Sequence, residues 1–247
     1  MARKKNSTKR LIRVPLGKSM RSIKLAKLIS VTLPLAFPGF SLAQGWIKYV
    51  DEAERFIVNF PREPDIREID YISEQGATFP ARVYSVDDSE SLYTVTVVDY
   101  TVAEKVHEER CTNPGYDCNG FEAGSDVRGS IAFAAWNFRQ QGDAEVTYDA
   151  YAAVDGIQGH QLQITRVDGS RSFIGIHLHA RRLYILEGTV PADWPPPGLF
   201  QQSLGILDEA GNGIRYRYDS NDNRIRMQTS YEWVGTEDPE TGEPQIQ

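Results

Sequence analysis

The chain has 247 residues, of which 40% are hydrophobic and 11% aromatic, and it carries 27 basic and 34 acidic residues. This length and apolar content suit one large domain with extensions. Ten of the basic residues lie in the first 43 positions, which contain no acid, so 17 basic residues face 34 acidic ones in the remainder. A surface this acidic repels phosphate backbones, and nucleic-acid binding is therefore not expected.

Residues 1–43 have the pattern of a secretory signal. A basic region precedes an apolar run from Leu28 to Phe40, and Ser41-Leu42-Ala43 then places small residues at the two positions that signal peptidase inspects. We expect cleavage after Ala43 and a location in the periplasm or outside the cell.

Other features of residues 1–43 concern a membrane span, the start of translation and an organelle transit peptide. The apolar run is short for a membrane span and contains Pro34 and Pro38, so we expect no transmembrane segment after cleavage. Met20 begins a signal of ordinary length and is a possible true start of translation. An organelle transit peptide is the alternative interpretation of the leader.

The two cysteines, Cys111 and Cys118, enclose a turn rich in Asn, Pro and Gly in the sequence CTNPGYDC. In an exported protein this spacing predicts a local disulfide, which stabilises a loop of this size by roughly 2.5 kcal/mol in the chain-entropy description. A redox pair or a thiolate metal site needs C-x-x-C spacing or further ligands, and the sequence has neither.

The mature part begins with strands. Apolar and polar residues alternate over Phe56–Phe60 and stop at Pro61. Two more strands are expected at Arg82–Val86 and Leu92–Val98, joined by the acidic turn Asp87–Ser89.

Helical spacing follows. The segment TVAEKVHEER predicts a short helix, and residues 125–141 predict a longer one with Ser125 or Asp126 as N-cap and Gly142 as its end. Its core-facing residues would be Val127, Ile131, Ala135 and Phe138. A last helix is expected at about Gly198 to Glu209, with Phe200, Leu204 and Leu207 directed inward.

Four strands lie between these helices, in AEVTYDAYAAV, GHQLQITRV, SRSFIGIHLH and RRLYILEGTV, with tight turns at Asp155-Gly156 and Asp168-Gly169. Residues 213–233 predict another hairpin, whose arginines alternate with Ile, Tyr and Met. Such alternation suits an RNA platform or a solvated strand face, and the net acidity favours the second. Residues 235–247 have no apolar period and predict a disordered acidic tail.

This order of elements is an α+β pattern: a single domain, 44–234, with an antiparallel sheet flanked by helices. Apolar residues occur on both faces of the central strands, so both faces are expected to be covered.

Three stretches resemble the exported bacterial relatives of the photosystem II extrinsic subunit P (PsbP) superfamily. They are RFIVNFPREP after Trp46, VDGIQGH from Val154 to His160, and ARRLYIL from Ala180 to Leu186, followed by a terminal helix containing Phe200 and Ser203. The resemblance covers roughly Trp46 to Leu207. It implies an α/β/α sandwich and a non-enzymatic interaction or assembly module, and it carries over no catalytic residue. The Cys111–Cys118 loop, the last hairpin and the acidic tail depart from the photosynthetic members, which makes a photosystem role doubtful.

Only the histidines are expected to lie close enough together to form a chemically active site. A two-residue turn at Asp168-Gly169 would place His160 opposite His177 and diagonal to His179, close enough for three imidazoles to meet one metal ion. A turn at Ala180-Arg181 would place Tyr184 opposite His177 and Arg182 opposite His179.

Arg182 repels a cation and no carboxylate is positioned to orient a ligand imidazole, so we expect no metal, no cofactor and no catalytic residue here. The five residues His160, His177, His179, Arg182 and Tyr184 are instead a candidate recognition patch, sensitive to pH because imidazole titrates near neutrality.

The sequence holds no G-x-S-x-G, P-loop, H-E-x-x-H or dinucleotide-binding motif. The leading hypothesis is an exported, monomeric or weakly associating binding module whose partner is a protein or small molecule of the envelope. The alternative is a metal-dependent or histidine-based hydrolase using His160, His177 and His179. A structural envelope protein is a third class and would co-purify with membrane or wall.

The first prediction concerns the leader. Small residues behind an apolar run direct cleavage after Ala43, so intact-mass analysis of exported protein should give a chain that starts at Gln44. A mature protein that retains Leu28–Phe40 would contradict both the location and the charge balance.

The second prediction concerns the cysteine pair. Alkylation of the exported protein without reductant should label neither Cys111 nor Cys118, because the two are expected to be bonded to each other. Ready labelling of both thiols would show that the disulfide is absent and would favour a reducing compartment.

Overall fold

The computed structural model describes residues 45–88, 90–111, 121–142 and 144–227, all within one compact unit, Ala43–Gln247. The predicted leader (1–43), Ser89, Cys118 and the predicted tail (235–247) lie outside the described residues. The disulfide with Cys111 and the limits of the signal therefore stay predictions.

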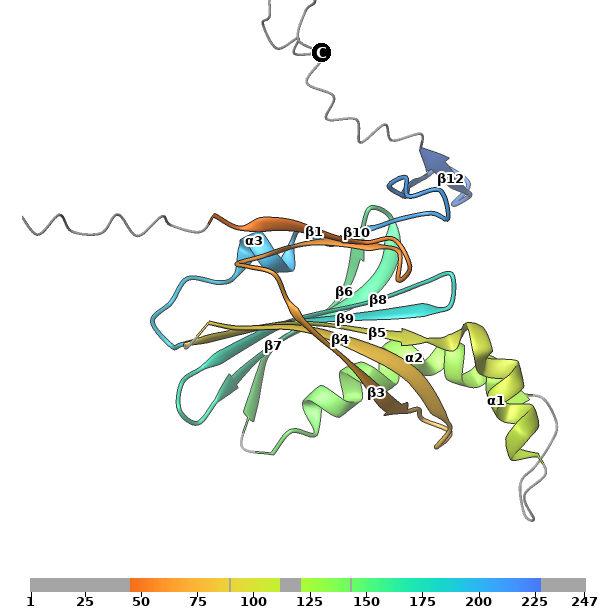
Figure 1. Cartoon of the computed structure of the whole chain (residues 1–247), viewed down its shortest axis with the longest axis horizontal. Coiled ribbons are helices and arrows are strands. Elements are labelled where there is room, and N and C mark those ends of the chain that lie inside the picture. Colours follow the sequence, from red (N-terminus) through yellow and green to blue (C-terminus); the bar gives the residue numbers. More distant parts are fainter. Residues whose placement is uncertain (1–44, 89, 112–120, 143, 228–247) are drawn as a thin grey trace, which may run out of the picture. The chain divides into compact units, whose positions relative to one another are not determined.

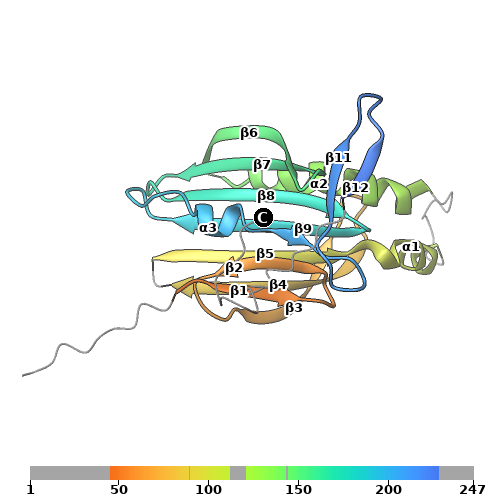
Figure 2. The same ribbon diagram turned by 90° about the horizontal axis from the view of Figure 1, so that it is seen from above.

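A seven-stranded antiparallel sheet forms the centre of this unit (Figures 1 and 2). In spatial order its strands are β3 (Asp65–Ile72), β4 (Thr78–Asp88), β5 (Ser91–Asp99), β9 (Arg182–Val190), β8 (Arg171–His179), β7 (Ile157–Arg166) and β6 (Ala144–Val154). Neighbours in the sheet are neighbours along the chain except at β5 and β9, where the helices intervene. The predicted alternation thus becomes two hairpin groups that meet at the middle of the sheet.

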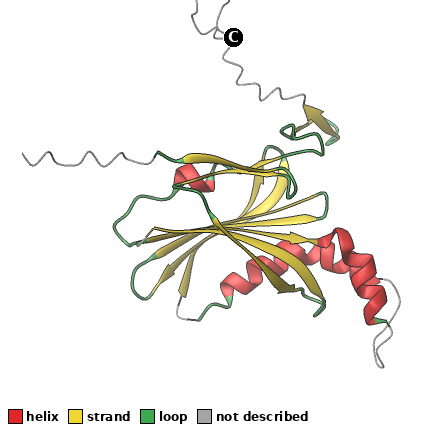
Figure 3. Ribbon diagram, viewed as in Figure 1, coloured by secondary structure: helices red, strands yellow, loops and turns green. Residues whose placement is uncertain are grey.

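One face of the sheet is covered by helices (Figure 3). The 3-10 turn η1 (Tyr100–Val102) leads into α1 (Ala103–Arg110), and α2 (Phe121–Arg139) packs across β7, β8 and β9. Their buried side chains form one core cluster with sheet residues such as Leu162, Ile174 and Leu183.

The opposite face carries a different layer. A three-stranded antiparallel sheet of β1 (Ile47–Asp51), β2 (Phe56–Phe60) and β10 (Gly205–Ile206), together with α3 (Gly198–Gln201), encloses a second cluster. This cluster is rich in aromatic rings, among them Phe56, Tyr84 and Tyr184. The predicted antiparallel α+β fold with both faces covered is confirmed, but in the described residues this second layer is mainly a sheet.

Two helix predictions need correction. Helix α2 begins at Phe121 rather than at Ser125 or Asp126, and Asp126 is buried inside it, so this carboxylate is not an N-cap. The last helix is one turn long, because the chain then extends so that Gly205 pairs with Ile57 of β2. Phe200, Leu204 and Leu207 are buried as predicted.

A two-stranded hairpin, β11 (Arg215–Tyr218) and β12 (Arg224–Met227), follows the small sheet. Its Tyr216 N–H donates to the carbonyl of Asp155 (2.7 Å), which attaches it to the turn between β6 and β7. The hairpin is present where the sequence predicts it. No helix in the described part of the chain is long and apolar enough to span a membrane.

Candidate functional site

The histidine cluster predicted from the sequence is not formed, because the β7–β8 hairpin has a different register. Gly159, rather than His160, lies opposite His177, and His160 lies opposite Ile176. The loop has three residues, 167–169, and Asp168 holds it by accepting from the backbone N–H (2.9 Å) and hydroxyl (2.7 Å) of Ser170. This shift of one residue turns His160 to the other face of the sheet.

His160 lies on the face covered by helices. Its Nε2 is 2.5 Å from Asp149 Oδ1, and Arg139 of α2 donates to both oxygens of the same carboxylate (2.6 and 2.9 Å). The hydrogen bond from Arg139 lowers the pKa of Asp149 to about 2. The three side chains join α2 to β6 and β7, which is a structural role.

His177 is buried on the opposite face, between Gly159 and Tyr184. A Cβ at Gly159 would overlap the imidazole of His177 and the carbonyl of Ile176, so glycine leaves the space that the ring fills. Burial lowers the pKa of His177 to about 4. The ring is therefore neutral at physiological pH and packs as part of the core.

His179 lies at the end of the same strand, opposite Arg182 as predicted, and its ring contacts that of Tyr216 at 5.8 Å between centroids. Burial lowers its pKa, and the cations Arg224, Arg226 and Arg55 add to the effect. Tyr184 faces His177 as the Ala180-Arg181 turn predicts. Burial thus lowers the pKa of both His177 and His179, which disfavours the charged form of either ring, and a pH response of the patch stays a prediction.

A buried polar network under the helices was missed by the sequence analysis. Asp126 accepts from the hydroxyl of Ser73 (2.7 Å) and the backbone N–H of Gln75 (3.0 Å), and its third contact is His107 Nε2 at 2.8 Å. These are the residue types of a catalytic triad in the wrong order, because the serine bonds to the carboxylate and not to the imidazole. The network fixes the β3–β4 turn against α1 and α2.

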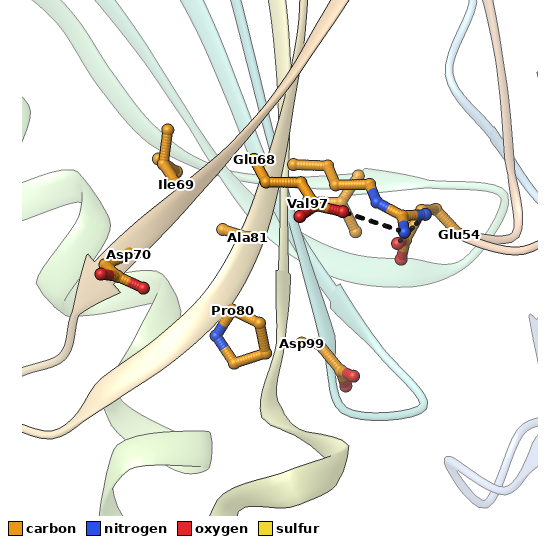
Figure 4. Close-up of a pocket in the computed structure, with 9 residues that line it drawn as sticks. Glu54, Glu68, Ile69, Asp70, Pro80, Ala81, Val97 and Asp99 are labelled. Atoms are coloured by element: carbon orange, nitrogen blue, oxygen red, sulfur yellow. Dashed lines mark hydrogen bonds and ion pairs between the residues drawn. The ribbon is translucent and has the colours of Figure 1, made fainter.

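A pocket with a cavity volume of about 390 Å³ lies on the face opposite these helices, beside the small sheet. Its polar lining comes from separate elements: Glu54 from the β1–β2 turn, Glu68 and Asp70 from β3, Arg82 from β4, and Asp99 from the end of β5. Figure 4 shows Glu54 and Asp70 at opposite ends of the pocket, with Glu68 and Asp99 between them. The strand registers explain the arrangement, since Arg82 pairs with Glu68 and Asp70 with Pro80.

Two tyrosines position the turn that carries Glu54. The Tyr184 hydroxyl donates to the Glu54 carbonyl (3.0 Å), and the Tyr84 hydroxyl donates to Asp51 Oδ2 (2.6 Å). Asp51 Oδ1 in turn accepts from the backbone N–H of Glu54 (2.8 Å). Burial raises the pKa of Tyr84 and of Tyr184, so both hydroxyls stay protonated as donors.

The Glu54 side chain is 15% exposed and lies between two guanidinium groups, 3.1 Å from Arg82 and 3.6 Å from Arg182. Burial raises the pKa of its carboxyl, and the two arginines oppose that shift. Arg82 also contacts Glu68 at 3.4 Å. The two cations are thus partly neutralised within the pocket wall.

The remaining carboxylates of the pocket, Asp99 and Asp70, differ in the hydrogen bonds that they make. Asp99 Oδ1 accepts from the N–H and hydroxyl of Thr101 (2.8 and 2.5 Å), whereas the Asp70 carboxylate makes no hydrogen bond or ion pair with any described residue. Four carboxylates therefore face two guanidinium groups, and the pocket carries a net negative charge. Among residues 45–88, 90–111, 121–142 and 144–227, no three His, Cys, Asp or Glu side chains are grouped closely enough to hold a metal ion.

Two residues of the predicted patch adjoin this pocket through Glu54: Arg182 by its ion pair and Tyr184 by its hydrogen bond to the Glu54 carbonyl. His160, His177 and His179 do not line it. In the sequence the lining residues look like ordinary surface charges, because they are spread from Glu54 to Asp99. The one available signal was the pair of charges on alternate positions of a strand, Glu68 and Asp70.

The third prediction follows from the burial of His177. Its pKa is about 4 in the folded chain against 6.5 for an exposed imidazole, so the unfolded chain binds more protons between these values. This contribution to stability is complete above pH 6.5 and is lost as the pH falls toward 4, by about 3 kcal/mol.

Urea unfolding at a series of pH values should show this loss in the wild type, and the variant His177→Leu should remove most of it. Ile176→Val, a core change on the same strand without a titratable group, serves as the control and should keep the wild-type slope. Parallel pH profiles for the wild type and His177→Leu would contradict the assignment.

No protein-family model and no curated protein sequence matches the chain. Cyanobacterial PsbP from Synechocystis sp. PCC 6803 is a structural match at 13% identity and a TM-score of 0.41, covering 70% of this chain and 99% of that protein. A protein of unknown function and putative regulator from Pseudomonas aeruginosa, PA94, matches at 8% identity and a TM-score of 0.27, covering 59% of this chain and 83% of its own. The match to PsbP is a structural resemblance only.

Proposed function

We propose that this protein is an exported, non-enzymatic binding module and that the pocket between Glu54 and Asp70 receives a positively charged group of its ligand. The observation that carries the proposal is the unpaired Asp70 carboxylate in a pocket whose acids outnumber its arginines. Asp70 is exposed, and a cation bound there would replace water as its partner. The strongly acidic chain would also attract cationic ligands from a distance.

The form of the pocket supports an organic cation. A cavity of about 390 Å³ suits an alkyl ammonium or guanidinium group, whether on a small molecule or on a side chain of a partner protein. Pro80, Ala81 and Val97 provide an apolar floor for the alkyl part, and Glu68 and Asp70 lie above it as acceptors. Arg82 and Arg182 hold Glu54 in place and limit the charge that a ligand must neutralise.

Membership of the PsbP-like superfamily and a periplasmic location are part of this proposal. They are supported by the quoted sequence stretches, by the pattern of the leader, and by the antiparallel sheet with its aromatic second layer. The hydrolase alternative has lost its geometric basis, because His160 lies on the opposite face of the sheet from His177 and His179.

The fourth prediction tests the pocket with agmatine, a small alkyl compound that carries both a guanidinium and an ammonium group. Isothermal titration should show saturable binding to the chain that begins at Gln44, and Asp70→Asn should weaken it roughly tenfold because the negative charge and one acceptor oxygen are lost. Asp65→Asn removes the same charge from the same strand outside the pocket and should leave the affinity unchanged.

Two results would contradict the proposal. One is the absence of agmatine binding to the wild type. The other is equal weakening by Asp70→Asn and Asp65→Asn, which would indicate attraction to the overall negative charge and not to this pocket.

A further inference from the structure

The two edges of the seven-stranded sheet differ in how they are protected. Edge strand β3 carries four charged residues among eight, Asp65, Arg67, Glu68 and Asp70, which oppose pairing with another strand. Edge strand β6 contains no lysine, arginine or proline over eleven residues. Its exposed apolar side chains are Val146 (37%), Tyr148 (44%) and Tyr151 (66%).

Strand β6 also extends beyond the helical layer. Helix α2 packs on β7, β8 and β9, and a hollow of about 300 Å³ separates it from Tyr151 on β6. The hollow has an apolar wall formed by Ile131 and Ala135, and Arg128 and Arg139 flank it.

The regular part of β6 has a symmetric centre. The register with β7 shifts between Val146 and Tyr148, and such a bulge interrupts a free edge at that point. The seven residues from Tyr148 to Val154 then run without interruption, and Tyr151 is the middle one. A twofold axis at Tyr151 pairs this whole segment with its own copy.

We infer that β6 is the interface of a weak homodimer, in which two copies pair their β6 strands antiparallel about a twofold axis at Tyr151. In this register Tyr148 faces Val154, and Ala150 faces Ala152. Asp149 faces Ala153, and its charge is already matched by Arg139 in the same copy, so no like charges are opposed. Each Tyr151 lies against the other at the opening of the hollow beside α2.

The contacts of this dimer determine how it responds to salt. The backbone pairing and the tyrosine contacts are insensitive to ionic strength, whereas the net negative charge of two acidic chains opposes association. Dimerisation should therefore strengthen as salt rises. An acidic or basic peptide bound at the same edge by charge would show the opposite trend.

The fifth prediction is tested by sedimentation velocity on the chain that begins at Gln44, which contains every described element. The dimer fraction should rise with protein concentration and between about 0.1 M and about 0.5 M salt. Tyr151→Lys should weaken the dimer roughly tenfold or more, because it places two cations opposite each other. Ile66→Lys, at an exposed apolar position of the β3 edge, should have no effect.

A cross-link then tests the register. Directly opposed Cα atoms on antiparallel strands are about 4.5 to 5.5 Å apart, within the range that a disulfide spans. In a Cys111→Ser, Cys118→Ser background, Tyr151→Cys should form a covalent dimer under mild oxidation, and Tyr148→Cys should not. A wild type that stays monomeric at high concentration and high salt, or equal cross-linking at both positions, would overturn the inference, and circular dichroism of each variant excludes unfolding as the cause.

Discussion

The tyrosine hydroxyls of Tyr84 and Tyr184 hold the β1–β2 turn against the large sheet, and much of the molecule depends on these two contacts. Both rings belong to the aromatic cluster that joins the layers, so each side chain contributes apolar area and one satisfied hydrogen bond. The turn carries Glu54, whose carboxylate orders Arg82 and Arg182. Docking of the small sheet and formation of the pocket are therefore one event.

Two β hairpins show which turns the sequence pattern predicts correctly and which it does not. Asp155-Gly156 forms the predicted two-residue turn, with φ of 49° and 74°, because both residues accept the left-handed conformation. Asp168-Gly169 is the same dipeptide but belongs to a three-residue loop, because the Asp168 carboxylate binds Ser170. A local side-chain hydrogen bond, invisible to alternation, decided the face on which His160 lies.

In the core, the apolar residues could be predicted from the sequence and the buried polar residues could not. Alternation and helical spacing predict the apolar residues well, since burial follows directly from period two or period 3.6. Asp126 is an exception. Beside a serine it matches a helix N-cap, yet it lies buried and its carboxylate contacts Ser73, Gln75 and His107 from other elements. Such contacts join residues that are far apart in the sequence. For the same reason the pocket, whose lining residues extend from Glu54 to Asp99, could not be predicted from the sequence.

The small sheet that covers the aromatic cluster is built from both ends of the described chain. Strand β10 pairs with β2, and Ser203 accepts the backbone N–H of Asn59, a contact that spans 144 positions. Contacts of this sequence separation are slow to form, because a long loop must close first. The hairpins of the large sheet are local by comparison and can form earlier. Until the segment around Ile206 arrives, β2 lacks its second neighbour and Phe56 its cover, so a chain that is shortened or delayed at this point exposes aromatic surface and an open strand edge.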